Sequence, residues 1–285
     1  MITSVAVEIA GIVIEITSDL PLDEDWVSRQ FRGFLTDKPA DCHLNVHYGI
    51  EPPVCLGNAK LLFDSGGVWK LYGVGNQQVI TLGVHEESGL PHLTGVFSSD
   101  FSQGNLYLTK LAYSPIPHPL PELLTVLLLA QGRGVMMHAC GVDDHGRGYL
   151  FSGSSGSGKS TLARLWTESG QGAVLNDDRI ILRVEDGAVW MYGTPWHGLF
   201  PEFRPERVQL ERIFFLYHAP KNVVNAVDGS AAVAGLLTRC FPVIWNTAAT
   251  VYTIDFMTAL ARKVPCSSLH FVPDSDVIDL VRCTR

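Results

Sequence analysis

Over the first 112 residues, short runs alternate between apolar and polar positions. Residues 4–9 and 11–17 flank the dipeptide Ala10-Gly11, and this spacing predicts a β-hairpin. Residues 23–34 predict a short helix that Asp23 or Asp25 would cap. Further strands are predicted at residues 44–50, 61–63, 68–71 and 79–82. We therefore expect a β-rich α+β domain over residues 1–114.

Four prolines separate this region from the rest of the chain: Pro115, Pro117, Pro119 and Pro121. Each proline fixes its φ angle and lacks an amide donor, so we expect an extended and exposed segment. Pro121 also suits the first turn of a helix, which the apolar residues 122–131 predict. The cluster predicts a domain boundary after residue 114 and a second domain over residues 115–285.

Beyond the prolines, strand patterns and helix patterns follow one another. A helix is predicted at residues 160–168, with polar turns at 143–148 and 185–187. Strands are predicted at residues 135–142, 148–152, 173–175, 179–184 and 188–192. Such mixing of strands and helices is typical of an α/β domain.

One motif joins the strand at 148–152 to the helix at 160–168. Residues 153–160 fit the pattern G-x-x-x-x-G-K-[ST] at every fixed position. Glycines let backbone amides approach phosphate oxygens, Lys159 reaches the β- and γ-phosphates, and Ser160 offers its hydroxyl to Mg²⁺. A linker is the alternative, but a linker need not end in Gly-Lys-Ser-Thr between a strand and a helix. The predicted nucleotide-binding residues are Gly153, Ser154, Ser155, Gly156, Ser157, Gly158, Lys159, Ser160 and Thr161.

Two adjacent aspartates, Asp177 and Asp178, follow this loop closely. Only 17 residues separate Lys159 from Asp177, which is enough for one helix and one turn. Because the helix leads away from the phosphates, the strand that returns must bring its end back toward them. Two carboxylates beside a triphosphate can divide their work between Mg²⁺ and proton transfer. A tight turn is the alternative interpretation of Asn-Asp-Asp.

Two further signals are weaker. His138 lies on a predicted strand that leads toward the same sheet, although a lone histidine on a strand is more often structural. Residues 192–198 form a loop rich in glycine and proline that also carries Trp196 and His197. Such a loop could cover a nucleotide or a substrate, or it could pack as an ordinary surface loop.

Composition narrows the classes of function. The net charge is −8 and no Lys/Arg cluster occurs, which argues against nucleic acid as a partner. The longest apolar run, residues 123–130, is too short to cross a bilayer, and residues 1–17 lack the basic leader of a signal peptide. Six scattered cysteines without a C-x-x-C pair predict free thiols in a reducing compartment. We expect a cytoplasmic protein that binds neither nucleic acid nor membrane.

The combination resembles the catalytic domain of the HPr kinase/phosphorylase family, whose core phosphoenolpyruvate carboxykinases share. That family has a histidine on the strand before the phosphate loop, a loop of the form G-x-S-G-x-G-K-S and an Asp-Asp pair shortly after the helix. Here these are His138, residues 153–160, and Asp177 with Asp178. The resemblance covers about residues 121–198, with a weaker likeness at 264–273. It implies an α/β P-loop kinase domain of the HPr kinase/PEP carboxykinase type.

The resemblance also implies roles for these residues. Asp178 would be the base that deprotonates an acceptor hydroxyl, His138 would lie beside the pair, and Lys159 would hold the nucleotide. Ser160 and Asp177 would hold the metal. ATP and Mg²⁺ are the implied cofactors. The acceptor would be a serine of a peptide or small protein, as for stand-alone HPr-kinase-related proteins of peptide-modifying clusters, and residues 1–114 would recognise it.

Some family features are missing, and they leave alternatives open. Residues 193–198 replace the family's Glu-x-Arg-Gly-x-Gly signature and contain no acid, which favours a nucleotide-dependent regulatory protein without transfer activity. A carboxykinase-type enzyme would need basic side chains that converge on a small organic acid. The family's later catalytic arginine has only unmarked candidates, Arg204, Arg207 and Arg262. A homo-oligomer is compatible with the sequence.

Overall fold

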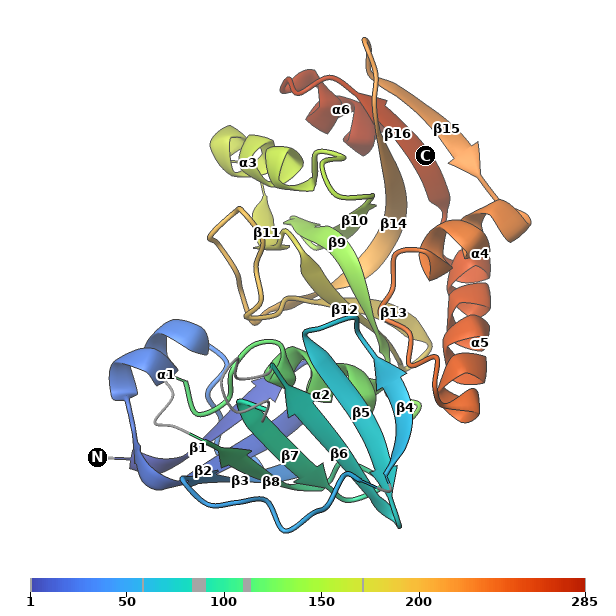
Figure 1. Ribbon diagram of the computed structural model, residues 1–285. Helices are drawn as coiled ribbons and strands as arrows, with labels where there is room; N and C mark the ends of the chain where they lie inside the picture. The colour runs from blue at the N-terminus through green and yellow to red at the C-terminus, as the bar shows by residue number, and fades with distance from the viewer. Residues whose placement is uncertain (1, 58, 84–90, 110–113, 171, 285) are drawn as a thin grey trace. The chain divides into compact units, whose positions relative to one another are not determined.

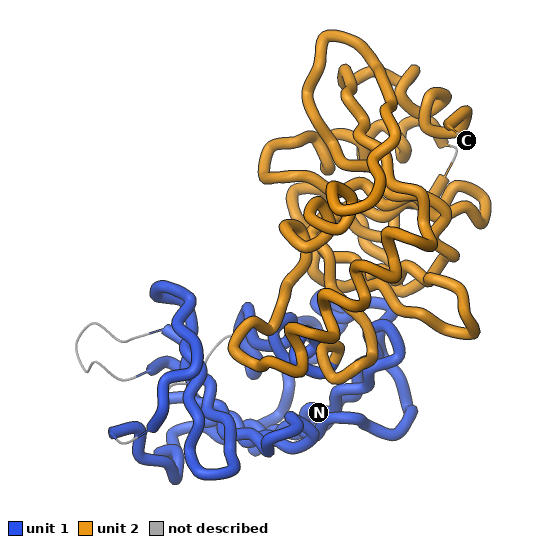
Figure 2. Tube along the Cα trace, turned by 90° about the vertical axis from the view of Figure 1, so that its right-hand side faces the viewer, with its two compact units in different colours: residues 1–128 blue, residues 129–285 orange. Residues whose placement is uncertain are grey.

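A computed structural model describes residues 2–57, 59–83, 91–109, 114–170 and 172–284 (Figure 1). Within these ranges the chain is a mixed α/β protein with two large sheets and six helices. It divides into two compact units, Met1–Leu128 and Leu129–Arg285 (Figure 2). This division falls within α2 (Leu120–Leu129), and the domain boundary expected after residue 114 stays a prediction.

The first unit is built on one eight-stranded sheet. Its elements are β1 (Ile2–Ile9), β2 (Ile12–Leu22), α1 (Glu24–Gln30), β3 (Cys42–Tyr48), β4 (Lys60–Asp64), β5 (Trp69–Val74), β6 (Gln77–Leu82), β7 (Leu93–Phe97) and β8 (Gln103–Leu108). The strand order is β1-β2-β3-β8-β7-β6-β5-β4, with parallel pairing only at β2–β3 and β3–β8 among the described strands. The predicted hairpin is confirmed, and it turns at Ala10 and Gly11, both at positive φ.

The sequence did not predict β7 and β8. Each contains a glycine, which weakens the strand pattern because it has no side chain to pack. A Cβ atom at Gly95 or at Gly104 would come within 2.6 Å of the Phe97 ring. The Phe97 ring therefore leaves room only for glycine at these two positions. The sequence pattern does not report this constraint, because it arises from the packing of neighbouring strands.

The end of one helix and the exposure of the proline segment also differ from expectation in this unit. The helix predicted over residues 23–34 begins as expected, because Asp23 accepts hydrogen bonds from the amides of Asp25 and Trp26, but it ends at Gln30. The buried Phe31 and Phe34 extend the apolar pattern beyond the helix. The expectation of an exposed proline segment is wrong at Pro115 and Ile116, which are buried. An apolar Ile116 between prolines packs inward even where the backbone is irregular.

The second unit contains a sheet in which five of the strands close into a ring. Its elements are β9 (Val135–Asp144), β10 (Arg147–Ser152), α3 (Lys159–Ser169), β11 (Ala173–Asn176), β12 (Arg179–Glu185), β13 (Ala188–Tyr192), β14 (Arg207–His218), β15 (Val223–Val227), α4 (Gly229–Leu237), α5 (Thr247–Lys263), β16 (Cys266–Phe271) and α6 (Asp276–Cys283). Strand β10 pairs with β9 and with β14, so the path β10-β9-β12-β13-β14 forms a ring. All five strands predicted here are present, although the turn after β9 is shorter than predicted.

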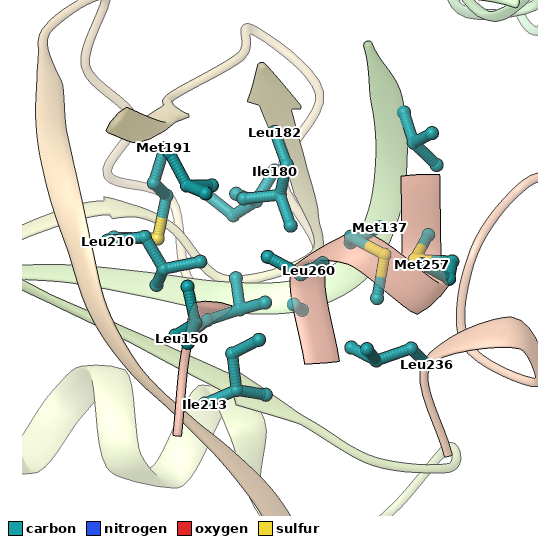
Figure 3. Close-up of a cluster of buried hydrophobic side chains, with 14 of the residues drawn as sticks. Met137, Leu150, Ile180, Leu182, Met191, Leu210, Ile213, Leu236, Met257 and Leu260 are labelled. Atoms are coloured by element: carbon teal, nitrogen blue, oxygen red, sulfur yellow. The ribbon is translucent and has the colours of Figure 1, made fainter. Parts of the chain in front are cut away.

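Two apolar clusters cover the opposite faces of this sheet. In the first, α4 and α5 pack against Met137, Leu150 and Ile180, as Figure 3 shows in part. In the second, α3 and α6 pack against the other face (Figure 1). The fully buried Trp166 belongs to this cluster and lies on α3. Side chains alternate along a strand, so His138, between Met137 and Ala139 of the first cluster, belongs to the α3 face.

Candidate active site

The phosphate loop runs between β10 and α3 along a path that requires glycine. Gly156 and Gly158 have φ angles of 77° and 101°, a region that other residues rarely adopt. A Cβ atom at Gly158 would lie 2.5 Å from the Phe271 ring, and one at Gly153 would lie 2.3 Å from the Ser157 hydroxyl. The motif residues predicted from the sequence thus lie in one tight turn at the start of α3.

Lys159 lies folded over this loop. Its ammonium donates to the carbonyl oxygens of Gly153 at 3.1 Å and Ser154 at 3.3 Å, and the residue is only 7% exposed. Burial lowers the pKa of Lys159, although the charge of Asp178 opposes that shift. The first amide groups of α3 have no partner within the helix, and the helix dipole adds positive potential there. Together these groups suit a phosphate ligand.

Asp177 is held on three sides. Its Oδ2 accepts from the Ser160 hydroxyl at 2.6 Å and from the Phe200 amide at 3.0 Å, while Oδ1 accepts from the Gly198 amide at 2.6 Å. The residue is 1% exposed. A Cβ atom at Gly198 would lie 3.1 Å from this carboxylate, so the loop approaches it closely. Asp177 therefore links the first turn of α3 to the loop after β13.

Asp178 contacts a histidine and an arginine. Its Oδ1 lies 2.9 Å from Nε2 of His138, and its Oδ2 accepts from Nη1 of Arg179 at 2.5 Å. Burial favours a higher pKa for Asp178, but the His138 hydrogen bond and the charges of Arg179 and Lys159 outweigh it. The net effect is a lowered pKa, so Asp178 is ionised at neutral pH.

The backbone around this pair is fixed by Asn176. Its side-chain oxygen accepts from the amides of Asp178 at 2.7 Å and Arg179 at 2.8 Å, and its amide group donates to the Thr194 carbonyl at 2.9 Å. Asn-Asp-Asp is thus a turn, as the alternative interpretation held, but Asn176 alone makes it. Both aspartate side chains are left to face the phosphate loop and His138.

His138 is positioned through its own backbone. Its amide donates to the Arg239 carbonyl at 2.8 Å, and its carbonyl accepts from the Ser152 hydroxyl at 2.9 Å. Ser152 ends β10, directly before the phosphate loop, so the strand that carries His138 is fastened to the strand that carries the loop. The structure therefore brings His138, Lys159, Ser160, Asp177 and Asp178 to one place.

Sequence reasoning missed Arg179 and Phe241 in this site. The Arg179 guanidinium lies 4.5 Å from the centre of the Phe241 ring, and that ring also lies near His138, with 6.5 Å between ring centres. The position of Arg179 beside the aspartates was an available signal. Phe241 gave none, because it reaches the site from the segment after α4.

The arginines that lacked a motif lie elsewhere. Arg207 pairs with Glu185 and stacks over Trp190 on the β13–β14 side of the sheet. Arg262 lines a groove between α4 and α5, and Arg204 is an exposed residue whose amide donates to the Leu175 carbonyl. Arg179, rather than these three, contacts the aspartate pair.

The oxygen atoms present fit a magnesium ion bound together with a nucleotide. The Ser160 hydroxyl and the Asp177 carboxylate are hard oxygen donors 2.6 Å apart. No cluster of three or more His, Cys, Asp or Glu side chains suited to a metal occurs in the described residues. Magnesium in phosphate sites commonly takes only one or two protein carboxylates, because substrate phosphates and water complete its shell.

Comparison with solved structures shows a likeness in fold. The chain is similar to the solved structure of the Hpr(Ser) kinase/phosphatase from Coxiella burnetii, with 14% identity and a TM-score of 0.32. The match covers 52% of this chain and 93% of that chain. No family model matches the sequence, and no curated protein does. Among the described residues, no helix is both long and apolar enough to span a membrane.

Proposed function

We propose that the chain is an ATP- and Mg²⁺-dependent kinase that transfers the γ-phosphate to a hydroxyl group, with a serine of a peptide or small protein as acceptor. The observation that carries this proposal is the 2.6 Å hydrogen bond between Ser160 of the phosphate loop and Asp177. It joins the loop that would hold the triphosphate to the carboxylate pair that would serve the metal and the proton.

The roles follow from the contacts of each residue. Lys159 and the amides at the start of α3 would hold the phosphates, and Ser160 and Asp177 would hold Mg²⁺. Bound magnesium neutralises charge on the phosphates. Asp178 is ionised and flanked by His138, so it is suited to accept the proton of the acceptor hydroxyl. The acceptor oxygen then bonds to the γ-phosphorus, and the bond to the β–γ bridging oxygen breaks, leaving ADP.

We assign acceptor recognition to the first unit. Its sheet carries polar side chains on one face, and a groove of about 710 Å³ opens beside the edge strand β1. The groove is lined by apolar Val5 and Leu35 and by charged Glu15 and Lys38, a mixture suited to a peptide. This assignment is independent of the kinase chemistry. If the groove does not bind the acceptor, the proposed phosphate transfer still stands.

One observation favours a regulatory protein without transfer activity. The loop tied to Asp177 through Gly198 and Phe200 contributes only backbone amides to that carboxylate, and residues 193–198 contain no acid. The metal would then have one fewer carboxylate than in the family that the sequence resembles. Such a protein would bind Mg-ATP and release it unchanged.

A transfer assay distinguishes the two functions. The chain is incubated with γ-labelled ATP, Mg²⁺ and a pool of serine-containing peptides, and every product is analysed by mass. The kinase proposal predicts peptides that gain one phosphate with wild-type protein and not with Asp178→Asn. Binding of Mg-ATP with no labelled peptide and no release of ADP would contradict it and support the regulatory function.

A further inference from the structure

Asp178, the proposed base, has both of its oxygens engaged. Oδ1 lies 2.9 Å from Nε2 of His138, and Oδ2 lies 2.5 Å from Nη1 of Arg179. A carboxylate that takes a proton from a hydroxyl must offer one oxygen to that hydroxyl within hydrogen-bond distance. Each oxygen can accept a second hydrogen bond, as Oδ2 of Asp177 does, but Asp178 becomes a stronger base once one of these two partners leaves.

Arg179 is the partner that can leave. The backbone of His138 is bonded to Arg239 and to Ser152 at the end of β10, and its side chain has only two rotatable bonds, so its ring can move less far than a guanidinium can. The guanidinium of Arg179, in contrast, stacks on the Phe241 ring with 4.5 Å to the ring centre. A flat group stacked on an aromatic ring can slide along it and keep most of the contact.

A bound triphosphate would offer Arg179 a second anionic partner. Lys159 of the phosphate loop lies close enough to Asp178 for its charge to act on that carboxylate, as does Arg179. Both cations thus act on the charge of Asp178. A triphosphate brings a γ-phosphate to the loop, and phosphate oxygens are a better match for the two-pronged guanidinium than one carboxylate oxygen.

We propose that Arg179 is a nucleotide-responsive clamp, which holds Oδ2 of Asp178 in the resting protein and moves to the γ-phosphate of a bound triphosphate. This inference rests on the proposed function. The move frees Oδ2, which then accepts the proton from the acceptor hydroxyl while the acceptor oxygen bonds to phosphorus and ADP leaves. Asp178 is thereby a stronger base once the phosphate to be transferred is in place.

Binding of ATP and of ADP tests the clamp without any turnover. ADP lacks the γ-phosphate, so Arg179→Gln should weaken Mg-ATP binding by roughly ten- to a hundredfold, the worth of a hydrogen-bonded charge, and leave Mg-ADP binding nearly unchanged. Arg179→Lys keeps the charge but loses the fork, and it should recover part of the loss. Arg183→Gln on the same strand is the matched control and should change neither affinity.

The results separate the clamp from a merely structural arginine. Circular dichroism and melting curves identify variants that fold, and Arg179→Lys serves if Arg179→Gln does not. Equal losses of ATP and ADP affinity, or no loss, in the folded Arg179 variants would overturn the clamp while leaving the kinase proposal intact. Absence of any nucleotide binding by the wild-type protein would overturn the proposed function and the clamp with it.

Discussion

The two units contain histidine–carboxylate pairs at nearly the same distance but in different surroundings. In the first unit His43 lies 2.8 Å from Glu15 and His47 lies 2.8 Å from Asp19, on the polar side of β3. In the second unit His138 lies 2.9 Å from Asp178. Exposure of the histidine does not separate the pairs, because the side chain of His47 is 23% exposed and that of His138 is 32% exposed. The difference is that Asp178 also faces Arg179 and the charge of Lys159.

This difference shows what defines a candidate active site. A histidine–carboxylate pair on an open sheet face contributes little to stability, because both groups give up contacts with water when they pair. The His138–Asp178 pair lies one residue from Asp177, which is bonded to the phosphate loop. The convergence of the phosphate loop, Asp177 and Asp178 distinguishes the second unit, and substitutions in the two units test that distinction.

The largest effect is expected for Asp178→Asn. This change keeps the shape of the side chain but removes the proton acceptor, so phosphate transfer should fall by roughly 10²–10⁴-fold. Mg-ATP affinity should not weaken, because a base acts only when the hydroxyl attacks. Steady-state transfer rates and calorimetric titrations measure the two quantities. Transfer at the wild-type rate would show that Asp178 is not the base.

A smaller effect is expected when the histidines of the two units are compared. His138→Ala removes a hydrogen bond to the charged Asp178 and should lower transfer by roughly ten- to a hundredfold. His47→Ala removes the equivalent contact to Asp19 and should leave transfer unchanged. Thermal melting of both variants provides the control. If both variants lose stability equally and both keep full transfer, His138 has only a structural role.

Asp177→Asn should act on binding rather than on proton transfer. The change removes a negative charge beside Ser160, and we expect Mg²⁺-dependent ATP affinity to fall by about tenfold. Because Asp177 accepts three hydrogen bonds in a buried position, the asparagine should also destabilise the fold by about 1–3 kcal/mol. Titrations with and without Mg²⁺ separate these effects. An equal affinity loss in both conditions would argue against a metal role.

The smallest effect concerns stability and pH in the first unit. Burial tends to lower the pKa of His47, but hydrogen bonds to Asn105 and Asp19 outweigh it and raise the pKa above 6.5. The charged form is therefore favoured by folding, so its stabilisation is complete below about pH 6.5 and is lost as the pH rises through the raised value. His47→Ala should cost under about 1 kcal/mol at pH 5.5 and less at pH 9. Denaturant unfolding at both pH values checks this, and a larger cost at pH 9 would contradict it.

The sequence predicted the parts of the site that depend on residue type and short spacing. The phosphate loop lies between the expected strand and helix, and the aspartate pair follows the expected short strand. The partners of that pair were not foreseeable in the same way. The amides of Gly198 and Phe200 reach Asp177 through the path of a loop, and a backbone amide leaves no pattern of residue type in the sequence. Phe241 reaches Arg179 from a segment about sixty residues further along the chain, which no periodic pattern reports.

The central claim is that the second unit binds Mg-ATP through the phosphate loop, and a calorimetric titration of wild-type and Lys159→Ala protein tests it most directly. Lys159 donates to two carbonyl oxygens of its own loop and lies outside both apolar clusters, so the alanine variant should keep the fold while it loses roughly 1–3 kcal/mol of stability. We expect measurable Mg-ATP binding by the wild type and a loss of at least roughly ten- to a hundredfold in the variant, because a charged partner of the phosphates is gone. Equal Mg-ATP affinity of the two proteins would contradict the assignment of this loop as the nucleotide site.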